Sequence, residues 1–438
     1  MIVLLGCILA AAATATAGVA HAGPDANADA GARGDAYPDS LDGPQEPANL
    51  LPRIDERRTQ KDSLSGVSPL GWLRDATGKA KQDLYDAIGL KVGAVFAHVF
   101  QGLSDAIPGE DKWGTATTLD LLGAWDLIHK GKPTLGQVVA HGQGRWDYGT
   151  RGPEELGTFS LASVIGTADT FSEYIPTFLL RNLYWRQGST EAGWVYRIGK
   201  ITPDALLNSS VHLDSQTTFL PSGGTGPFAI ALPDSGLGAV GAWYFNDRVA
   251  LAGLVSDANA DRFDWGDIGE GDLFVAGELQ VKVAPMTPKA PYSKLTIWYT
   301  DGTKDGQPSN AMAGPSGWGV YLMHQQELTA DGRAIGIVRY GKSFDDSAVY
   351  DQQAAAHFLL YEPRLLTRLE NDVVGAAFNY AKAPQTGARS EYNVEVFYRF
   401  PIFPNVDTTL SYQSVINPAL TRDVDHASVF SLRIRFAF

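Results

Sequence analysis

The stretch Ala427–Phe438 reads ASVFSLRIRFAF, and it determines the fold class that we predict for this chain. Bulky apolar residues occupy every second position, while Ser431, Arg433, Arg435 and Ala437 occupy the positions between them. Successive side chains of a β-strand point to opposite faces, so this alternation predicts a strand with one apolar and one polar face. A closed barrel in a bilayer would place the apolar face in lipid and the arginines in a water-filled interior. A strand of a soluble β-sandwich would show the same alternation.

The composition narrows the classes of protein to consider. The 438 residues include 47 glycines, 17 tyrosines and 10 tryptophans, and hydrophobic residues account for 44% of the chain. After the N-terminal stretch, no run is long and apolar enough for a membrane-spanning helix. This excludes a helical membrane protein but not a barrel, whose strands are only half apolar. The formal net charge of -14 gives a nucleic-acid partner no electrostatic support.

The N-terminal stretch is typical of an exported protein. Residues 1–22 are mostly small and apolar, and Ala20-His21-Ala22 fits the A-x-A cleavage motif, so we expect a signal peptide. A lipoprotein signal ending at Cys7 is a weaker alternative, because too little chain precedes it. Cys7 is the single cysteine of the chain, so the exported part is predicted to have neither disulfides nor thiol chemistry.

Two further segments precede the predicted barrel, which spans residues 89–438. Residues 23–70 are rich in Pro, Gly, Asp and Ala without periodicity, and we expect a flexible arm there. Apolar residues at helical spacing over 71–88, from Trp72 to Ile88, predict one short amphipathic helix. Such a helix could plug the pore, rest in the periplasm or contact a partner, and packing against the barrel is the simplest interpretation.

From Gly89 onward, alternating segments separated by turn residues predict strands. We identify about 17 candidates of the length that tilted barrel strands need, and we exclude 212–220 because single-chain bacterial barrels have even strand counts. The predicted fold class is therefore an all-β transmembrane antiparallel barrel of about 16 strands. The retained strands are 89–101, 116–128, 135–147, 178–187, 193–201, 237–246, 247–256, 271–283, 292–301, 317–328, 332–342, 353–362, 372–382, 390–400, 406–416 and 427–438.

Several of these strands have one charged face and one bulky apolar face. Glu278 and Lys282 oppose valines and leucines on one strand, and Glu395 and Arg399 oppose aromatic and aliphatic residues on another. A soluble sheet would bury the bulky face and a membrane barrel would turn it to lipid, so alternation alone leaves both open. Aromatic residues near strand ends, where barrel girdles lie, favour the membrane barrel. They are Trp185, Trp194, Tyr244, Tyr299, Tyr380, Tyr398 and Phe400.

Short motifs recur along the chain in the order in which one protein family has them. Tyr392–Phe400 (YNVEVFYRF), Leu410–Pro418 (LSYQSVINP) and Ser431–Phe438 (SLRIRFAF) resemble the end of the carbohydrate-selective porin family typified by OprB. Each motif is short, so their order over residues 89–438 carries more weight than any single one. Earlier matches are Leu119-Asp120 with Trp125, Tyr196–Lys200, Ser256–Asp261 and Val338–Gly341.

The resemblance implies a pore in the outer membrane of a Gram-negative bacterium, through which sugars diffuse down their gradient with no cofactor and no enzymatic step. It also implies outer-membrane lipid and the barrel-assembly machinery as partners, with Phe438 as the terminal aromatic residue that the machinery reads. Porins of this size often form homotrimers, although the sequence identifies no interface. The long arm before the barrel departs from the plain family pattern.

A sugar channel needs hydrogen-bond donors and acceptors that release their solute as readily as they bind it. The polar faces of the predicted strands supply such groups, although each of them could equally form a structural salt bridge inside the barrel. Lys200 falls on the opposite face of its strand from Arg197, so we expect a bulge or a strand end near Gly199. The predicted pore-lining residues are Arg197, Glu278, Lys282, Glu395, Arg399, Arg433 and Arg435.

Two motifs match known ligand sites in their letters but not in their context. Gly336–Ser343 fits the phosphate-loop pattern G-x-x-x-x-G-K-[ST], yet its middle residues favour a strand and no helix follows, so we predict no nucleotide site. Asp257, Asn259 and Asp261 begin a calcium-loop pattern, but the glycine and the glutamate that complete it are replaced. We therefore favour a solvated acidic loop over a metal site.

His212, Asp214 and Ser215 are close enough in sequence to suggest a hydrolase. No oxyanion site accompanies them, and turn formation explains them better, so we do not expect an enzyme. Two alternatives to the sugar porin stay open. One is a general diffusion porin without sugar preference, and the other is a secreted soluble β-rich glycan-binding protein, which would lack a lipid-facing band.

Overall fold

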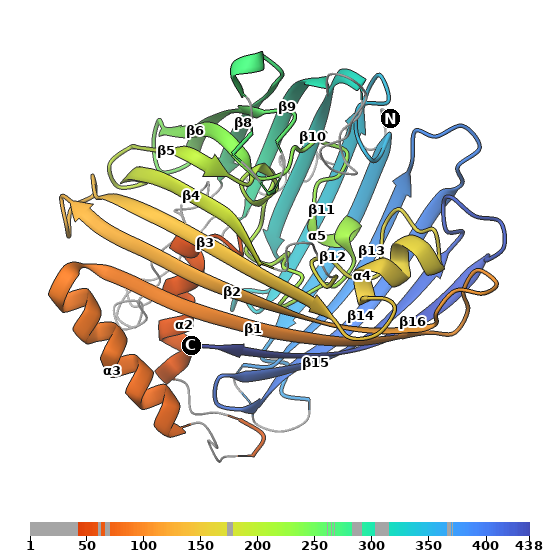
Figure 1. Ribbon diagram of the computed structural model, residues 1–438, viewed down its shortest axis with the longest axis horizontal. Coiled ribbons are helices and arrows are strands. Elements are labelled where there is room, and N and C mark those ends of the chain that lie inside the picture. Colours follow the sequence, from red (N-terminus) through yellow and green to blue (C-terminus); the bar gives the residue numbers. More distant parts are fainter. Residues whose placement is uncertain are drawn as a thin grey trace. The chain divides into compact units, whose positions relative to one another are not determined.

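Sixteen strands form a closed antiparallel barrel, in which each strand pairs with its neighbours in sequence and the last strand pairs with the first (Figure 1). This confirms the predicted all-β barrel. The computed structural model describes residues 43–59, 63–65, 71–172, 178–260, 262–263, 265–266, 268–282, 291–302, 315–365, 369 and 371–438, with the backbone alone for residues 55–59, 73–74 and 270.

Every retained strand of the prediction corresponds to one strand of the barrel, and residues 212–220 are not a strand. The phosphate-loop motif, Gly336–Ser343, lies within a strand, β11, as its β-forming residues predict. The strands are β1 Leu90–Leu103, β2 Trp113–Ile128, β3 Gly136–Asp147, β4 Phe178–Ser189, β5 Trp194–Ile201, β6 Gly236–Tyr244, β7 Val249–Asp257, β8 Leu273–Lys282, β9 Tyr292–Gly302, β10 Pro315–Glu327, β11 Ala334–Ser343, β12 Gln352–Tyr361, β13 Val373–Lys382, β14 Ser390–Phe403, β15 Val406–Ile416 and β16 His426–Ala437.

The helices are few, and they lie before the barrel or in the connections between strands. In the described part of the chain, none of them is long and apolar enough to cross a membrane. A helix spans the predicted residues 71–88. It contacts β1, and its Tyr85 hydroxyl donates to Asp126 of β2 (3.2 Å). The helical segments are α2 Pro47–Thr59, α3 Gly71–Ile88, α4 Pro153–Glu155, η1 Leu156–Ser160, η2 Pro203–Ala205, α5 Ser222–Thr225 and η3 Ile268–Glu270.

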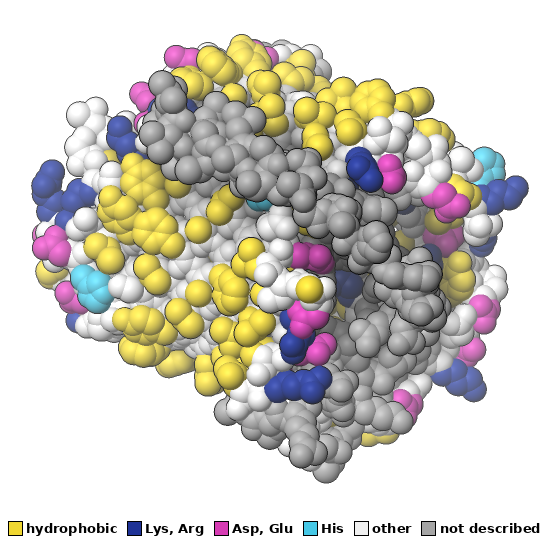
Figure 2. Space-filling model, turned by 180° about the vertical axis from the view of Figure 1, so that it is seen from behind, with side chains coloured by type: hydrophobic (Ala, Val, Ile, Leu, Met, Phe, Trp, Pro, Cys, Tyr) yellow, Lys and Arg dark blue, Asp and Glu magenta, His cyan; other side chains and the backbone are white. Residues whose placement is uncertain are grey.

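The two faces of the barrel wall differ in polarity. On β16, Phe430 is 60% exposed on the outer face, whereas Arg433 and Arg435 are buried on the inner face. Figure 2 shows hydrophobic side chains spread over much of one outer side, with Lys, Arg, Asp and Glu gathered mainly toward its edges. Because a soluble sheet buries its bulky face, an apolar outer wall around a polar interior is the arrangement of a membrane barrel.

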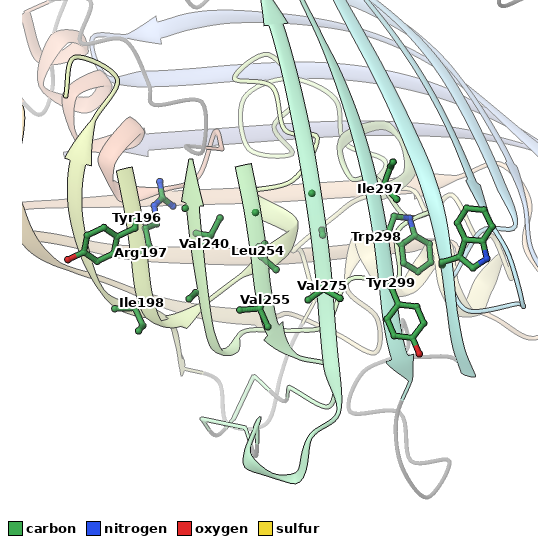
Figure 3. Close-up of a pocket in the computed structure, with 16 residues that line it drawn as sticks. Tyr196, Arg197, Ile198, Val240, Leu254, Val255, Val275, Ile297, Trp298 and Tyr299 are labelled. Atoms are coloured by element: carbon green, nitrogen blue, oxygen red, sulfur yellow. The ribbon is translucent and has the colours of Figure 1, made fainter. Parts of the chain in front are cut away.

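A hollow of about 800 Å³ marks the outer wall over β5 to β10. Its floor is a row of glycines that are paired across three strands, Gly241 with Gly253 and Gly253 with Gly277. Nothing lies within 4 Å of the position where a Cβ would stand at Gly253 or Gly277. Tyr196 and Ile198 flank the row on this side of β5, and Arg197 between them points to the other side (Figure 3).

Two connections fold into the barrel instead of extending from its end. The first inner segment, residues 153–172, follows β3, and the second inner segment, residues 202–235, follows β5. Phe171 in the first and Phe219 in the second are both fully buried. The excluded candidate strand 212–220 is thus part of a segment whose apolar residues are buried without pairing in the sheet.

Residues 43–59 correct the prediction of a flexible arm over 23–70. They include α2, and Leu51 and Ile54 on this helix are each only 2% exposed. Both side chains lie against Gly93 of β1, where a Cβ would come within 2.8 Å of Leu51. Gly93 has the same strand parity as the lumen-facing Val95, so α2 lies inside the barrel. The rest of the described arm, residues 63–65, runs alongside the end of β14.

The apolar face of α2 explains why these residues are ordered. Burial of Leu50, Leu51 and Ile54 stabilises the helix, while Pro47 stands at its first residue, a position where the missing N–H costs nothing. The prolines and the short apolar stretch resemble the composition of a linker, which is why periodicity did not predict the helix. The rest of the predicted arm up to residue 42 and the predicted signal peptide, 1–22, lie outside the described residues.

Phe438 closes the wall beside β1. Its backbone N–H donates to the carbonyl oxygen of Ala94 (2.8 Å), and the N–H of Ala94 donates to the carbonyl oxygen of Phe438 (3.0 Å). The last residue of the sequence therefore continues the β1–β16 ladder. Its expected role as an assembly signal stays a prediction.

Candidate functional site

All seven residues predicted to line the pore are buried on the inner side of the wall. Two of the four arginines among them, Arg399 and Arg433, bind backbone carbonyl groups of the second inner segment. Arg433 donates to the carbonyl oxygens of Ser215 (2.6 Å) and Thr218 (2.9 Å), and Arg399 donates to that of Thr217 (2.9 Å). Hydrogen bonds from a charged donor are stronger than neutral ones, so these arginines fix the path of the segment.

The predicted carboxylates have similar roles. Glu395 accepts hydrogen bonds from the backbone N–H of Leu220 (3.1 Å) and from the hydroxyl of Ser411 (2.6 Å). Glu278 accepts one from the backbone N–H of Asn208 (2.6 Å) and lies 3.4 Å from the ammonium group of Lys294. Each carboxylate thus joins the wall to the second inner segment.

The remaining predicted residues lie on the inner face of the wall, and one of them contacts the segment before β1. Arg435 lies 4.0 Å from Asp407 on the neighbouring β15, and Lys282 is buried near the end of β8. Arg197 forms an ion pair with Glu46 (3.2 Å), a residue of the predicted flexible arm. The contacts of Arg435 and Arg197 are those of structural ion pairs, the alternative that the sequence left open.

A cavity of about 70 Å³ remains between the wall and the inner segments. Arg181 and Asn182 both line it, although neighbouring residues of a regular strand point to opposite faces. The register between β3 and β4 shifts at this position, since His141 pairs with Asn182 and Gly142 pairs with Leu180. Arg181 is therefore the extra residue of a β-bulge, a feature that re-aims side chains toward functional sites.

The cavity contains charges of both signs. The guanidinium group of Arg181 lies 3.8 Å from the carboxylate of Asp204 and donates to the side-chain oxygen of Gln143 (3.3 Å). His141 also lines the cavity, and its ring lies 2.8 Å from the carboxylate of Asp120. Paired donors and acceptors of this kind can bind hydroxyl groups without binding an ion permanently.

Asp169 of the first inner segment is the most perturbed acid at this cavity. Burial away from water, with the nearby carboxylate of Glu154 as a smaller cause, raises the pKa of Asp169 to about 7. A carboxyl group with such a pKa changes its charge near neutral pH. The cavity therefore gains a negative charge as the pH rises through 7.

Glu46, Arg181, Asp204 and Asp169 are not among the residues that the sequence predicts for the site. The pair Arg181-Asn182 did carry a signal, because two adjacent polar residues interrupt the alternation of Phe178–Ser189 and indicate a bulge. No comparable pattern marks the other three, which lie outside the strands.

The expected irregularity near Gly199 is present. Gly199 has a φ of +140°, a conformation that favours glycine, and the Lys200 side chain after it is buried and donates to the carbonyl oxygen of Arg262 (3.2 Å). The alternation of β5 is thus broken at this point, and Arg197 and Lys200 are both buried.

The sequence motifs suggestive of other chemistry are explained by local hydrogen bonds. The ring of His212 contacts the hydroxyl of Tyr361 (2.5 Å), whereas Asp214 accepts from Thr217 (2.6 Å), as in a turn. In the acidic loop, Asn259 donates to Asp272 (2.6 Å). Among the described residues, which do not include Asp261, Asp264 and Asp267, no group of three or more metal-binding side chains is found.

Residues 233–438 match the model of the family described as carbohydrate-selective porin, OprB family. This C-terminal part of the chain is therefore similar to the carbohydrate-selective porins. The matched part begins just before β6 and includes the strands that bear most of the anchoring residues. The first five strands, both α2 and α3, and the first inner segment lie before it.

Solved structures share the fold of this chain. The high-pH structure of Pseudomonas putida OprB superposes with a TM-score of 0.65 at 14% identity, over 83% of this chain and 97% of that chain. The low-pH structure of the same protein gives a TM-score of 0.52 at 12% identity, over 85% of this chain and 100% of that chain. No match was found among curated proteins.

Proposed function

We propose that this porin lets sugars, either mono- or oligosaccharides, diffuse passively through its barrel across the outer membrane of a Gram-negative bacterium. The observation that carries the proposal is the cavity at the β4 bulge, where Arg181 and Asp204 offer donors and acceptors side by side. The family match and the polar interior within an apolar wall support it. The family match and the fold support a channel and not an enzyme.

The inner segments give the channel its selectivity in this proposal. A barrel of about 16 strands encloses a wide aqueous lumen when it is empty. Here Arg433, Glu395 and Glu278 hold the second inner segment across that lumen, so a solute must pass close to polar side chains. A sugar exchanges its water for these groups and moves on, because no single contact is strong enough to retain it.

Single-channel conductance in a planar bilayer tests the proposal. We expect stepwise currents from the purified protein that glucose and a disaccharide block in a saturable manner. Arg181→Ala should raise the apparent dissociation constant of the blocking sugar by about tenfold, since it removes one charge-assisted donor worth about 1.4 kcal/mol.

Arg333→Ala is the matched control, because Arg333 pairs with Asp331 on an exposed turn and is remote from the cavity lining. Steps that sugars do not block would show a general diffusion porin instead. If folded protein gives no stepwise currents, the proposal that it forms a channel is wrong. Lipid on the outer wall, the barrel-assembly machinery and a homotrimer are the partners that the family resemblance implies, and they belong to this proposal.

A further inference from the structure

We propose that residues 43–59, hereafter the plug, narrow the sugar channel from inside and help to determine which solutes pass. The inference rests on the proposed function. The plug lies before residues 233–438, the part of the chain that matches the porin family.

The helix of the plug occupies the lumen side of the wall. α2 contacts β1, β2 and β3, with Leu50, Leu51 and Ile54 buried between them. The wall has a glycine, Gly93, where any larger side chain would collide with Leu51. A helix with its side chains is about 10 Å wide, so its presence removes a large part of the cross-section of the lumen.

A buried latch holds the start of the plug. The carboxylate of Glu46 accepts hydrogen bonds from Tyr184 (2.7 Å) and Asn182 (3.3 Å) and forms the ion pair with Arg197 (3.2 Å). Glu46 is 1% exposed and Arg197 is fully buried. Removing one member of a buried ion pair leaves the charge of the other without that partner, which is strongly unfavourable. The latch therefore favours the plugged state.

The tip of the plug reaches the second inner segment. The side-chain amide of Gln45 donates to Asp214 (3.1 Å) and to the hydroxyl of Ser215 (3.2 Å). Gly43 packs directly on the backbone of Ala205, where a Cβ would lie only 2.0 Å from the carbonyl oxygen. Plug and inner segment thus form one continuous constriction.

The plug also forms part of the solute cavity. Gln45 and Glu46 line it together with Arg181 and Asp204. Glu46 offsets the charge of Arg197 within this small space, so the plug sets both the width and the charge balance of the passage. Its release should widen the channel and leave a positive charge exposed in the lumen.

Two kinds of variant distinguish the effect of the plug on the width of the channel from its effect on the charge selectivity. Glu46→Ala removes the latch, and the double variant Leu51→Asn with Ile54→Asn removes the apolar contact of α2. Both should raise single-channel conductance by about twofold or more and admit larger poly(ethylene glycol) molecules, because the open cross-section increases. Glu46→Gln keeps the hydrogen-bond acceptor for Tyr184 but not the charge, so it should shift the reversal potential in a KCl gradient toward anion selectivity with little change in conductance.

Trp72→Ala is the matched control, because Trp72 lies on α3 and is 71% exposed. It should leave conductance and sieving unchanged. A circular dichroism spectrum like that of the wild type would show that each variant is folded. Suppose that the wild type forms channels that sugars block, and that the folded Glu46→Ala and double variants have the same conductance and the same size limit. The proposed narrowing by the plug is then refuted, while the porin function stands. If the wild type forms no channels, the proposed function itself fails.

Discussion

On β16, Phe430 is 60% exposed on the outer face, whereas Arg433, three residues later, is 1% exposed and binds two carbonyl groups of the second inner segment. The same contrast holds around the barrel. The outer face has to be apolar and needs no defined partner, as the open space at Gly253 shows. The inner face is specific, because its charged groups meet particular atoms from distant parts of the chain. Substitutions on the two faces should therefore differ in cost even when they are chemically alike.

The largest effect is expected from Glu391→Ala on the inner face of β14. Glu391 accepts hydrogen bonds from the backbone N–H groups of Val164 (2.9 Å), Ile165 (3.2 Å) and Ala419 (2.8 Å). Leaving these buried donors without an acceptor costs about 1–3 kcal/mol each, so the free energy of unfolding should fall by about 3 kcal/mol or more. Urea unfolding in detergent would measure it, with Glu191→Ala at an exposed turn as the control. Equal stability of both variants would contradict the proposed anchoring.

A pair of glycine variants compares the two faces directly. A Cβ at Gly375 would lie 2.2 Å from the ring of Phe397 in the lumen, whereas one at Gly253 would meet nothing within 4 Å on the outer wall. Gly375→Val should lower the free energy of unfolding by about 2 kcal/mol through overpacking. Gly253→Val should change it by less than about 0.5 kcal/mol. Thermal unfolding of the two proteins checks the difference, and equal losses would show that the outer wall is as tightly constrained as the lumen.

The smallest effect is expected from the ionisation of Asp169 as the pH changes around neutrality. The pKa of Asp169 is about 7 in the folded protein, above the ordinary value of 3.8, so its neutral form favours folding. Its contribution to stability is therefore fully present below the unfolded pKa, and it is lost as the pH rises through 7. In the channel, the same ionisation should increase cation selectivity between about pH 6 and pH 8. Reversal potentials should show this shift in the wild type, and Asp169→Asn should abolish it; a shift that persists in the variant would assign it to another group.

The strands of the wall could be predicted from the sequence because the pattern that indicates them lies within each strand. An alternation with a period of two residues fixes both the strand and the direction of each side chain, so Arg433 and Glu395 were correctly expected on the polar face. Their partners could not be predicted, because Ser215 is separated from Arg433 by 218 residues and follows no period. The plug was missed because Pro47 and Pro52 in a short apolar stretch resemble a linker. The bulge at Arg181 was the one feature of the cavity that the sequence did signal.

The anchors of the inner segments also impose an order of events. Ser163 and Glu391 are hydrogen-bonded across 228 residues, and Leu220 meets Glu395 across 175. Closing loops of this length brings an entropic cost before any contact compensates for it. When the chain emerges from its N-terminus, neither of these two contacts can form until β14 has been made. A barrel that assembles in this order completes its constriction only after most of its wall exists, so the capacity to discriminate between solutes is acquired late.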